Sequence, residues 1–112
     1  MNPYIAHIYG KSRGASDGEC SYNAQRAIWW EQRLIKLGHN PYNPLLRHFT
    51  SVGWKDGVSE DKYFDLSIEW LKKCDCLFVA EMPMGNESGV HREIEIATEL
   101  GLPVYYDIED IK

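Results

Sequence analysis

Apolar side chains recur along the chain in two spacings, and each spacing predicts one kind of element. Short runs that are mostly apolar or β-branched predict buried strands at residues 4–9, 40–42, 76–81 and 103–106. Apolar positions at helical spacing predict helices at residues 23–37, 61–73 and 89–100. Between the second strand and the second helix, Pro and Asn residues interrupt both patterns, so we expect a long loop through Gly57.

Residues at the ends of the predicted helices favour these bounds. Asn23 and Ser88 can cap the first and third helices, and Gly38 and Gly101 suit the left-handed residue that stops a helix. Strands and helices alternate along the chain, which predicts an α/β domain. We expect one small three-layer Rossmann-like (flavodoxin-like) domain over residues 1–112, with a parallel sheet of four to five strands and helices on both faces.

Composition and charge narrow the class of protein. The chain is 44% hydrophobic and 26% charged, which is typical of one globular domain. Its net charge is -5 and its basic residues are scattered, which argues against a nucleic-acid polymer as partner. No apolar stretch approaches the roughly 18 residues of a membrane span, and no signal segment precedes the first strand, so we expect no membrane partner.

The cysteines and histidines show no metal-ligand pattern. The three cysteines are odd in number, and Cys74 and Cys76 lack the two-residue spacer of a redox or zinc pair. They predict reduced thiols and a cytoplasmic protein. No Walker-type or GxGxxG phosphate loop is present, and neither a metal nor an organic cofactor is expected.

Two loops are placed where an open parallel sheet binds its ligands, beyond the carboxyl ends of the strands. One begins at Gly10 after the first strand, and the other spans residues 82–88 after the third and contains Asn86. The second loop leads into a helix, whose free amides and positive dipole end favour a negative group or a sugar hydroxyl.

Glu93 lies about one turn into that helix and shares a face with Gly89 and Ala97. A carboxylate among small and apolar neighbours is partly desolvated, and Gly89 allows a ligand to approach closely, so both favour a site. The alternative is that Glu93 is an ordinary acid, because acids are favourable in the first turns of any helix.

Four further side chains have both a structural and a functional interpretation. Asp65 lies one position off the apolar stripe of the second helix, so that it either points toward the same crevice or into solvent. Tyr4, His7 and Tyr9 belong to the first strand, where each can be a core residue or a site residue; a histidine in an apolar strand is more often a core residue than a catalyst.

Three segments of the chain resemble those of a known family. They are the start Tyr4-Ile5-Ala6, the run 71–81 with Asp65 ahead of it, and residues 88–97 followed by Gly-Leu-Pro-Val at 101–104. They resemble the nucleoside 2-deoxyribosyltransferase superfamily, which includes nucleoside deoxyribosyltransferases and nucleotide N-glycosidases. The resemblance spans nearly the whole chain, with a weaker middle between His48 and Glu60, and implies cleavage or exchange of the N-glycosidic bond of a 2'-deoxynucleoside or its 5'-monophosphate.

The resemblance also implies roles for three residues. Glu93 matches the catalytic carboxylate, which attacks the anomeric carbon and forms a glycosyl-enzyme intermediate. Asp65 matches the acid that binds the sugar and orients this nucleophile, and Tyr4 matches the tyrosine placed against the glutamate. A carboxylate on one face of the sugar suits an oxocarbenium-like transition state. A water acceptor gives hydrolysis, and a second nucleobase gives transfer.

The chain departs from the family pattern at two places. The family often has Gly after Tyr-Ile-Ala, where this chain has His7, which alters the floor of the base pocket. Nucleotide-specific members carry a hydroxyl residue six positions before the catalytic glutamate, and Glu87 stands there in this chain. Its like charge favours a free nucleoside over a monophosphate, although Ser88 or Arg13 could still contact a phosphate.

Two other functions remain open at this point: a non-catalytic nucleotide or nucleotide-sugar binding module, and an NAD-type glycohydrolase that also uses a glutamate. In each case the expected partner is a small-molecule nucleoside or nucleotide. Trp29, Trp30 and Trp54 are numerous for so small a domain, and exposed members of this group favour a homo-oligomer.

Overall fold

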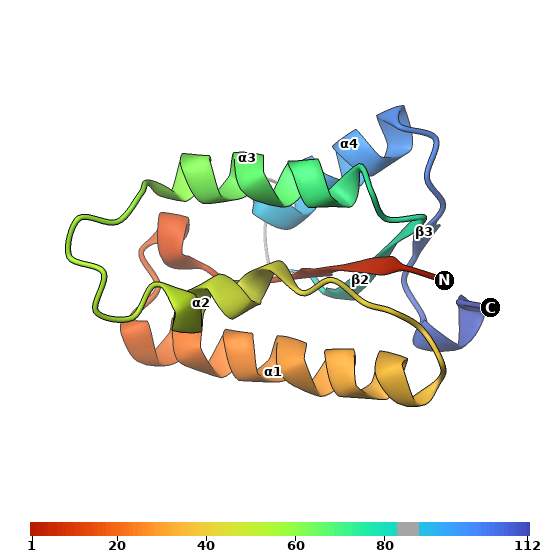
Figure 1. Cartoon of the computed structure of the whole chain (residues 1–112), viewed down its shortest axis with the longest axis horizontal. Coiled ribbons are helices and arrows are strands. Elements are labelled where there is room, and N and C mark those ends of the chain that lie inside the picture. The colour runs from red at the N-terminus through yellow and green to blue at the C-terminus, as the bar shows by residue number, and fades with distance from the viewer. Residues whose placement is uncertain (83–87) are drawn as a thin grey trace.

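The structure, a computed structural model, describes residues 1–82 and 88–112. A small sheet lies between two helical layers, with α3 (Glu60–Leu71) and α4 (Gly89–Glu99) on one face and α1 (Asp17–Lys36) on the other (Figure 1). The fold class is therefore α/β, as predicted from the alternation of elements. At the end of the sheet where β1 stops, the short helix α2 and the amino end of α4 lie close to the strand end (Figure 1).

Within the described residues the sheet has three parallel strands, β1 (Pro3–His7), β2 (Cys76–Glu81) and β3 (Val104–Tyr105), in the order β1-β2-β3. The four to five strands predicted from the sequence are not observed. Instead of a strand at residues 40–42, Tyr42 makes a single parallel bridge to Tyr4. Pro44 opens a 3-10 turn two residues later and has no backbone N–H to donate, so pairing does not extend further.

The bridge places Tyr42 next to β1, at an edge of the sheet. The Ile5 amide donates to the Tyr42 carbonyl at 2.9 Å, and the Tyr42 amide donates to Pro3 at 2.8 Å. Tyr42 thus lies on the edge of β1 opposite to β2, so that the order across the sheet is Tyr42, β1, β2 and β3. The order reverses between β1 and β2, which defines where a ligand is expected.

Successive residues of β1 and β2 pack against opposite helical layers, as the pleat of a strand requires. Tyr4, Ala6, Leu77 and Val79 face the side covered by α3 (Glu60–Leu71) and α4 (Gly89–Glu99). Ile5, Cys76 and Phe78 face α1 (Asp17–Lys36) and the C-terminal 3-10 turn η3 (Ile108–Asp110). Tyr4 therefore reaches α4 because it is on the α3–α4 side of its strand.

Helix α1 begins at Asp17, six residues before the predicted start. Ser16 and Glu19 form a capping box, in which the Ser16 hydroxyl accepts the Glu19 amide at 3.2 Å and the Glu19 carboxylate accepts the Ser16 amide at 3.5 Å. Asn23 is not a cap; its side-chain amide donates to the Tyr9 carbonyl at 3.0 Å. This bond fastens α1 to the segment that follows β1.

The other two long helices have caps close to the predicted positions. Ser59 caps α3 by accepting the Lys62 amide at 3.1 Å, and α3 ends two residues before the predicted end. Ser88 caps α4 as predicted, accepting the His91 amide at 3.2 Å. The segment predicted as a long loop contains the 3-10 turn η2 (Pro44–Leu46) and α2 (Arg47–Thr50).

In the described part of the chain, no helix is both long and apolar enough to cross a membrane. All three cysteines are free thiols. Burial raises the pKa of Cys76 to about 12 and that of Cys74 to about 11, with a further contribution from the Asp75 carboxylate. These thiols are therefore core residues and not reactive nucleophiles.

Candidate active site

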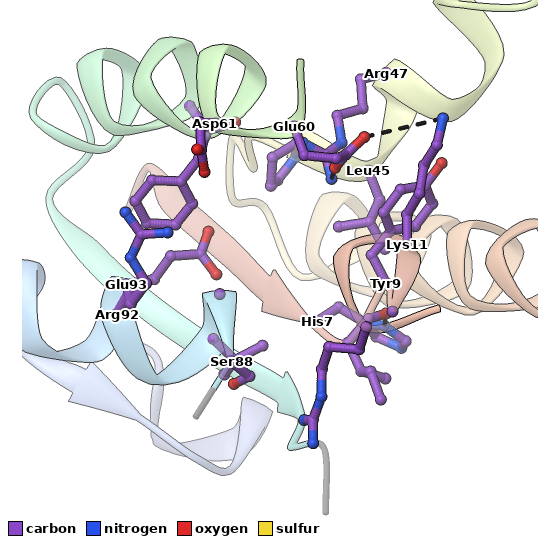
Figure 2. Close-up of a pocket in the computed structure, with 18 of the residues that line it drawn as sticks. His7, Tyr9, Lys11, Leu45, Arg47, Glu60, Asp61, Ser88, Arg92 and Glu93 are labelled. Atoms are coloured by element: carbon purple, nitrogen blue, oxygen red, sulfur yellow. Dashed lines mark hydrogen bonds and ion pairs between the residues drawn. The ribbon is translucent and has the colours of Figure 1, made fainter. Parts of the chain in front are cut away.

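A cavity lies beyond the carboxyl end of β1, where the strand order reverses (Figure 2). Its wall combines the end of β1 and the 3-10 turn η1 (Lys11–Arg13) with η2, α2, the first half of α3 and the start of α4. Seven of the residues proposed from the sequence line it together: Tyr4, His7, Tyr9, Gly10, Ser88, Gly89 and Glu93. Asn86 and Glu87 lie outside the described residues.

Glu93 is the buried carboxyl group of this cavity, with only 7% of the residue exposed. Its position follows from α4, which begins at the Ser88 cap and brings Glu93 over the sheet after one turn. The Tyr4 hydroxyl donates a hydrogen bond to Glu93 Oε2. Tyr4 itself is fully buried and fixed by β1 pairing on both of its edges, so the contact is held by the core.

Burial controls the protonation of this pair. Desolvation raises the pKa of Glu93 to about 8, although the Tyr4 hydrogen bond and the charges of Arg47 and Arg92 act in the opposite direction. The pKa of Tyr4 lies well above its ordinary value, because it is buried and adjacent to Glu93. Tyr4 is therefore a permanent donor, while Glu93 is mostly protonated at neutral pH in the free protein.

Asp65, the acid assigned to sugar binding by resemblance, is exposed and is not part of the cavity wall. Helix α3 turns Phe64 and Ser67 toward the cavity, and Asp65 lies to the outside of this face. Asp61, one turn earlier, does line the cavity. Figure 2 shows the Asp61 carboxylate on the same side of the cavity as Glu93.

Arg47 occupies the wall away from Glu93 and was not proposed from the sequence. Its Nη2 donates to Glu60 Oε2 at 2.6 Å, and its guanidinium carbon lies 4.7 Å from the centre of the Tyr9 ring and 5.2 Å from that of Tyr63. Arg47 Nε is buried and makes no hydrogen bond within the described residues. Glu60 and the two tyrosine rings thus hold the guanidinium in place, and its Nε–H group remains without a hydrogen-bond acceptor among the described residues.

Tyr9 and Gly10 shape the path from β1 into η1. The Tyr9 hydroxyl lies 2.7 Å from His48 Nδ1, and burial raises the pKa of Tyr9 to about 12, so the hydroxyl stays protonated. Gly10 has a φ of +90°, and a Cβ at this position would come within 2.9 Å of Ala15 Cβ. Only glycine allows the sharp turn that brings Lys11 to the cavity.

His7 forms part of the floor and connects the ends of the two strands. Its Nδ1 donates to the Ile8 carbonyl at 2.7 Å, and its Nε2 lies 3.2 Å from Glu81 without the alignment of a hydrogen bond. Arg26 of α1 donates to the same carboxylate at 2.7 Å. Burial lowers the pKa of His7 from its ordinary value. Both ring nitrogens lie against protein groups, so His7 is fixed in the floor of the cavity.

Two contacts organise the start of α4. Ser88 Oγ lies 2.6 Å from His91 Nδ1 in addition to capping the helix. The Arg92 guanidinium stacks over Phe64 of α3, with 4.0 Å between its carbon and the ring centre. These contacts fix the α4 end of the cavity against α3. Across residues 1–82 and 88–112, no three His, Cys, Asp or Glu side chains are arranged to hold a metal ion.

Comparison with known proteins identifies the fold. No family model matches the chain, and no curated protein matches it. Among solved structures, the chain is similar to a 2-deoxyribosyltransferase from the psychrotolerant bacterium Bacillus psychrosaccharolyticus, with a TM-score of 0.65 and 20% sequence identity over 93% of this chain and 69% of that one. At this identity the similarity establishes a shared α/β fold.

Proposed function

We propose that the protein cleaves or exchanges the N-glycosidic bond of a 2'-deoxynucleoside or its 5'-monophosphate, with Glu93 as the nucleophile. The observation that carries this proposal is a buried carboxyl group, hydrogen-bonded by a fully buried tyrosine, in a cavity at the switch point of a parallel sheet. The similar solved structure, which is that of a 2-deoxyribosyltransferase, supports the same chemistry.

The residues divide the reaction into two displacements. One Glu93 oxygen bonds to the anomeric carbon while the bond from that carbon to the base nitrogen breaks, and the base leaves with the electron pair and takes up a proton. Water or a second base then attacks the anomeric carbon and releases the Glu93 carboxylate. Tyr4 holds the other carboxylate oxygen, and Asp61 takes the sugar-binding role that the resemblance assigned to Asp65.

The nucleophile must be ionised, and the site contains groups that favour ionisation. The Tyr4 hydrogen bond and the charges of Arg47 and Arg92 lower a pKa that burial alone would raise further. A positive charge that develops on the sugar also favours the ionised form of Glu93. Base release should therefore increase with pH up to about 8, the pKa of Glu93 in the free protein.

Chromatographic assay of base release tests the proposal directly. The protein is incubated with the four common 2'-deoxynucleosides and their 5'-monophosphates, with and without a second free base. Glu93→Ala should abolish release, whereas Glu95→Ala, on the exposed face of the same helix, should not. Formation of a new nucleoside identifies a transferase, and free base alone identifies a hydrolase.

Two outcomes would overturn the proposal. Base release that persists in folded Glu93→Ala would remove Glu93 as the nucleophile. Tight binding of a panel member without release, equally in the wild type and in Glu93→Gln, would make the protein a binding module that uses the same cavity.

A further inference from the structure

The described lining of the cavity carries more basic than acidic side chains, although the chain as a whole is acidic. Among the described residues that line it, four side chains are cationic: Lys11, Arg13, Arg47 and Arg92. The acidic ones are Glu60, Asp61 and Glu93, and the last is mostly uncharged at neutral pH because burial raises its pKa to about 8. Even without Arg13, the three cations Lys11, Arg47 and Arg92 outnumber the carboxylates of Glu60 and Asp61 along the described lining, in a protein whose net charge is -5. Such a concentration of positive charge favours an anionic ligand.

Two of these cations share one counterion. Glu60 Oε2 lies 2.6 Å from Arg47 Nη2, and Glu60 Oε1 lies 4.0 Å from Lys11 Nζ. The three residues come from α2, α3 and η1 and gather on the wall of the cavity away from Glu93 (Figure 2). We call this group the Arg47–Glu60–Lys11 cluster. In this cluster the Glu60 carboxylate binds the same nitrogen donors of Arg47 and Lys11 that a bound anion would use.

The surroundings of the Arg47 guanidinium favour binding of an anion. Aromatic rings of Tyr9 and Tyr63 flank its guanidinium, and Nε is buried without a hydrogen-bond partner in the described part of the chain. A guanidinium only donates, so the missing partner must be an acceptor. The planar fork of arginine matches two oxygens of a phosphate, and little side-chain freedom is left to lose on binding.

We propose that the substrate carries a 5'-phosphate and that Arg47 and Lys11 hold it, with the phosphate displacing Glu60 from their donors. This inference rests on the proposed function and specifies its substrate as a 2'-deoxynucleoside 5'-monophosphate. Arg47 and Glu93 line the same cavity from different walls, so a phosphate on Arg47 would leave the sugar between them (Figure 2). The sequence analysis favoured a free nucleoside because of Glu87, which lies outside the described residues. The described lining of the cavity favours a monophosphate instead.

Binding measurements test the inference separately from catalysis. Glu93→Gln serves as the background, so that ligands are not consumed. Isothermal titration compares 2-deoxyribose with 2-deoxyribose 5-phosphate, and the four common 2'-deoxynucleosides with their 5'-monophosphates. Arg47→Met should weaken binding of the phosphorylated ligands about 10- to 100-fold, the usual value of a lost hydrogen bond between charged groups. The unphosphorylated ligands should change less than about twofold.

Three further variants distinguish phosphate binding from a structural role. Arg33→Met removes an arginine that stacks on Trp29 of α1, away from the cavity, and should leave all affinities unchanged. Lys11→Met should weaken the phosphorylated ligands without disturbing the ring contacts of Arg47. Glu60→Gln should strengthen their binding, because it removes the competing carboxylate; a purely structural ion pair would predict a loss.

The outcomes separate this inference from the proposed function. Equal losses for phosphorylated and unphosphorylated ligands in Arg47→Met, or equal affinities for both in the parent protein, would overturn the phosphate site. Glu93-dependent release from free nucleosides without a preference for monophosphates would do so while leaving the proposed function intact. Arg47-dependent binding of monophosphates without any base release would retain the phosphate site and refute the glycosidic chemistry.

Discussion

Replacing Glu93 by Gln should make the protein more stable while removing its proposed nucleophile. The pKa of Glu93 is about 8 in the folded protein against an ordinary value of 4.5. Between these two pH values the folded state holds a proton that the unfolded state has lost, so stability falls as pH rises from about 4.5 to about 8. The amide of Glu93→Gln has the same shape but does not ionise, so its stability should not fall in this way. Its oxygen can still accept the Tyr4 hydrogen bond.

The magnitude follows from the pKa. At about 1.4 kcal/mol for each pH unit, the ionised carboxylate costs the folded state about 5 kcal/mol at pH 9. The same relation gives a cost of about 1 kcal/mol at pH 5 and about 3 kcal/mol at pH 7. The free energy of unfolding of Glu93→Gln should therefore exceed that of the wild type by an amount that grows across this range.

Urea unfolding at pH 5, 7 and 9 measures the difference. Glu95→Gln, which removes an exposed carboxylate from the same helix, is the matched control and should show no such growth. A constant offset between Glu93→Gln and the wild type reflects packing of the amide and does not bear on the reasoning. A difference that stays the same from pH 5 to pH 9 would refute the raised pKa of Glu93.

Three other substitutions test separate parts of the structure. Tyr4→Phe removes a hydrogen bond that lowers the pKa of Glu93, so the pH profile of base release should move to higher pH. Gly10→Ala places a Cβ at a φ of +90° and 2.9 Å from that of Ala15, and thermal unfolding should show a loss of about 1–3 kcal/mol. Leu34→Ala empties a fully buried position under β1 and should cost about 2–5 kcal/mol in urea unfolding; a loss below 1 kcal/mol would contradict its place in the core.

The elements that were predicted correctly are determined by residues that are close together in the sequence. The bounds of β2 match the prediction residue for residue, because a continuous apolar run marks a strand covered on both faces. Ser88 at the start of α4 was likewise evident, since capping depends on residues within one turn. In the structure Glu93 shares the buried face of α4 with Val90 and Ala97.

What the sequence did not disclose depends on contacts between distant segments. Arg47 belongs to a four-residue helix with no apolar periodicity, and its importance comes from Glu60 and two tyrosines in other elements. Asp61 and Asp65 are both acids in the first half of α3, and only the rotation of that helix against the sheet shows which one faces the cavity. By contrast, the Ser16–Glu19 capping box was present in the sequence as a readable Ser-x-x-Glu signal for the earlier start of α1.

The pairing of Tyr4 with Glu93 has a consequence for how the protein is made. The two residues stand 89 positions apart, so a ribosome completes one of them long before the other. Until β2 emerges, β1 has among the described residues only the bridge to Tyr42 along its backbone, and its central edge stays open to wrong partners. The Tyr4–Glu93 contact, and with it the cavity, can therefore form only once β2 and α4 have been synthesised.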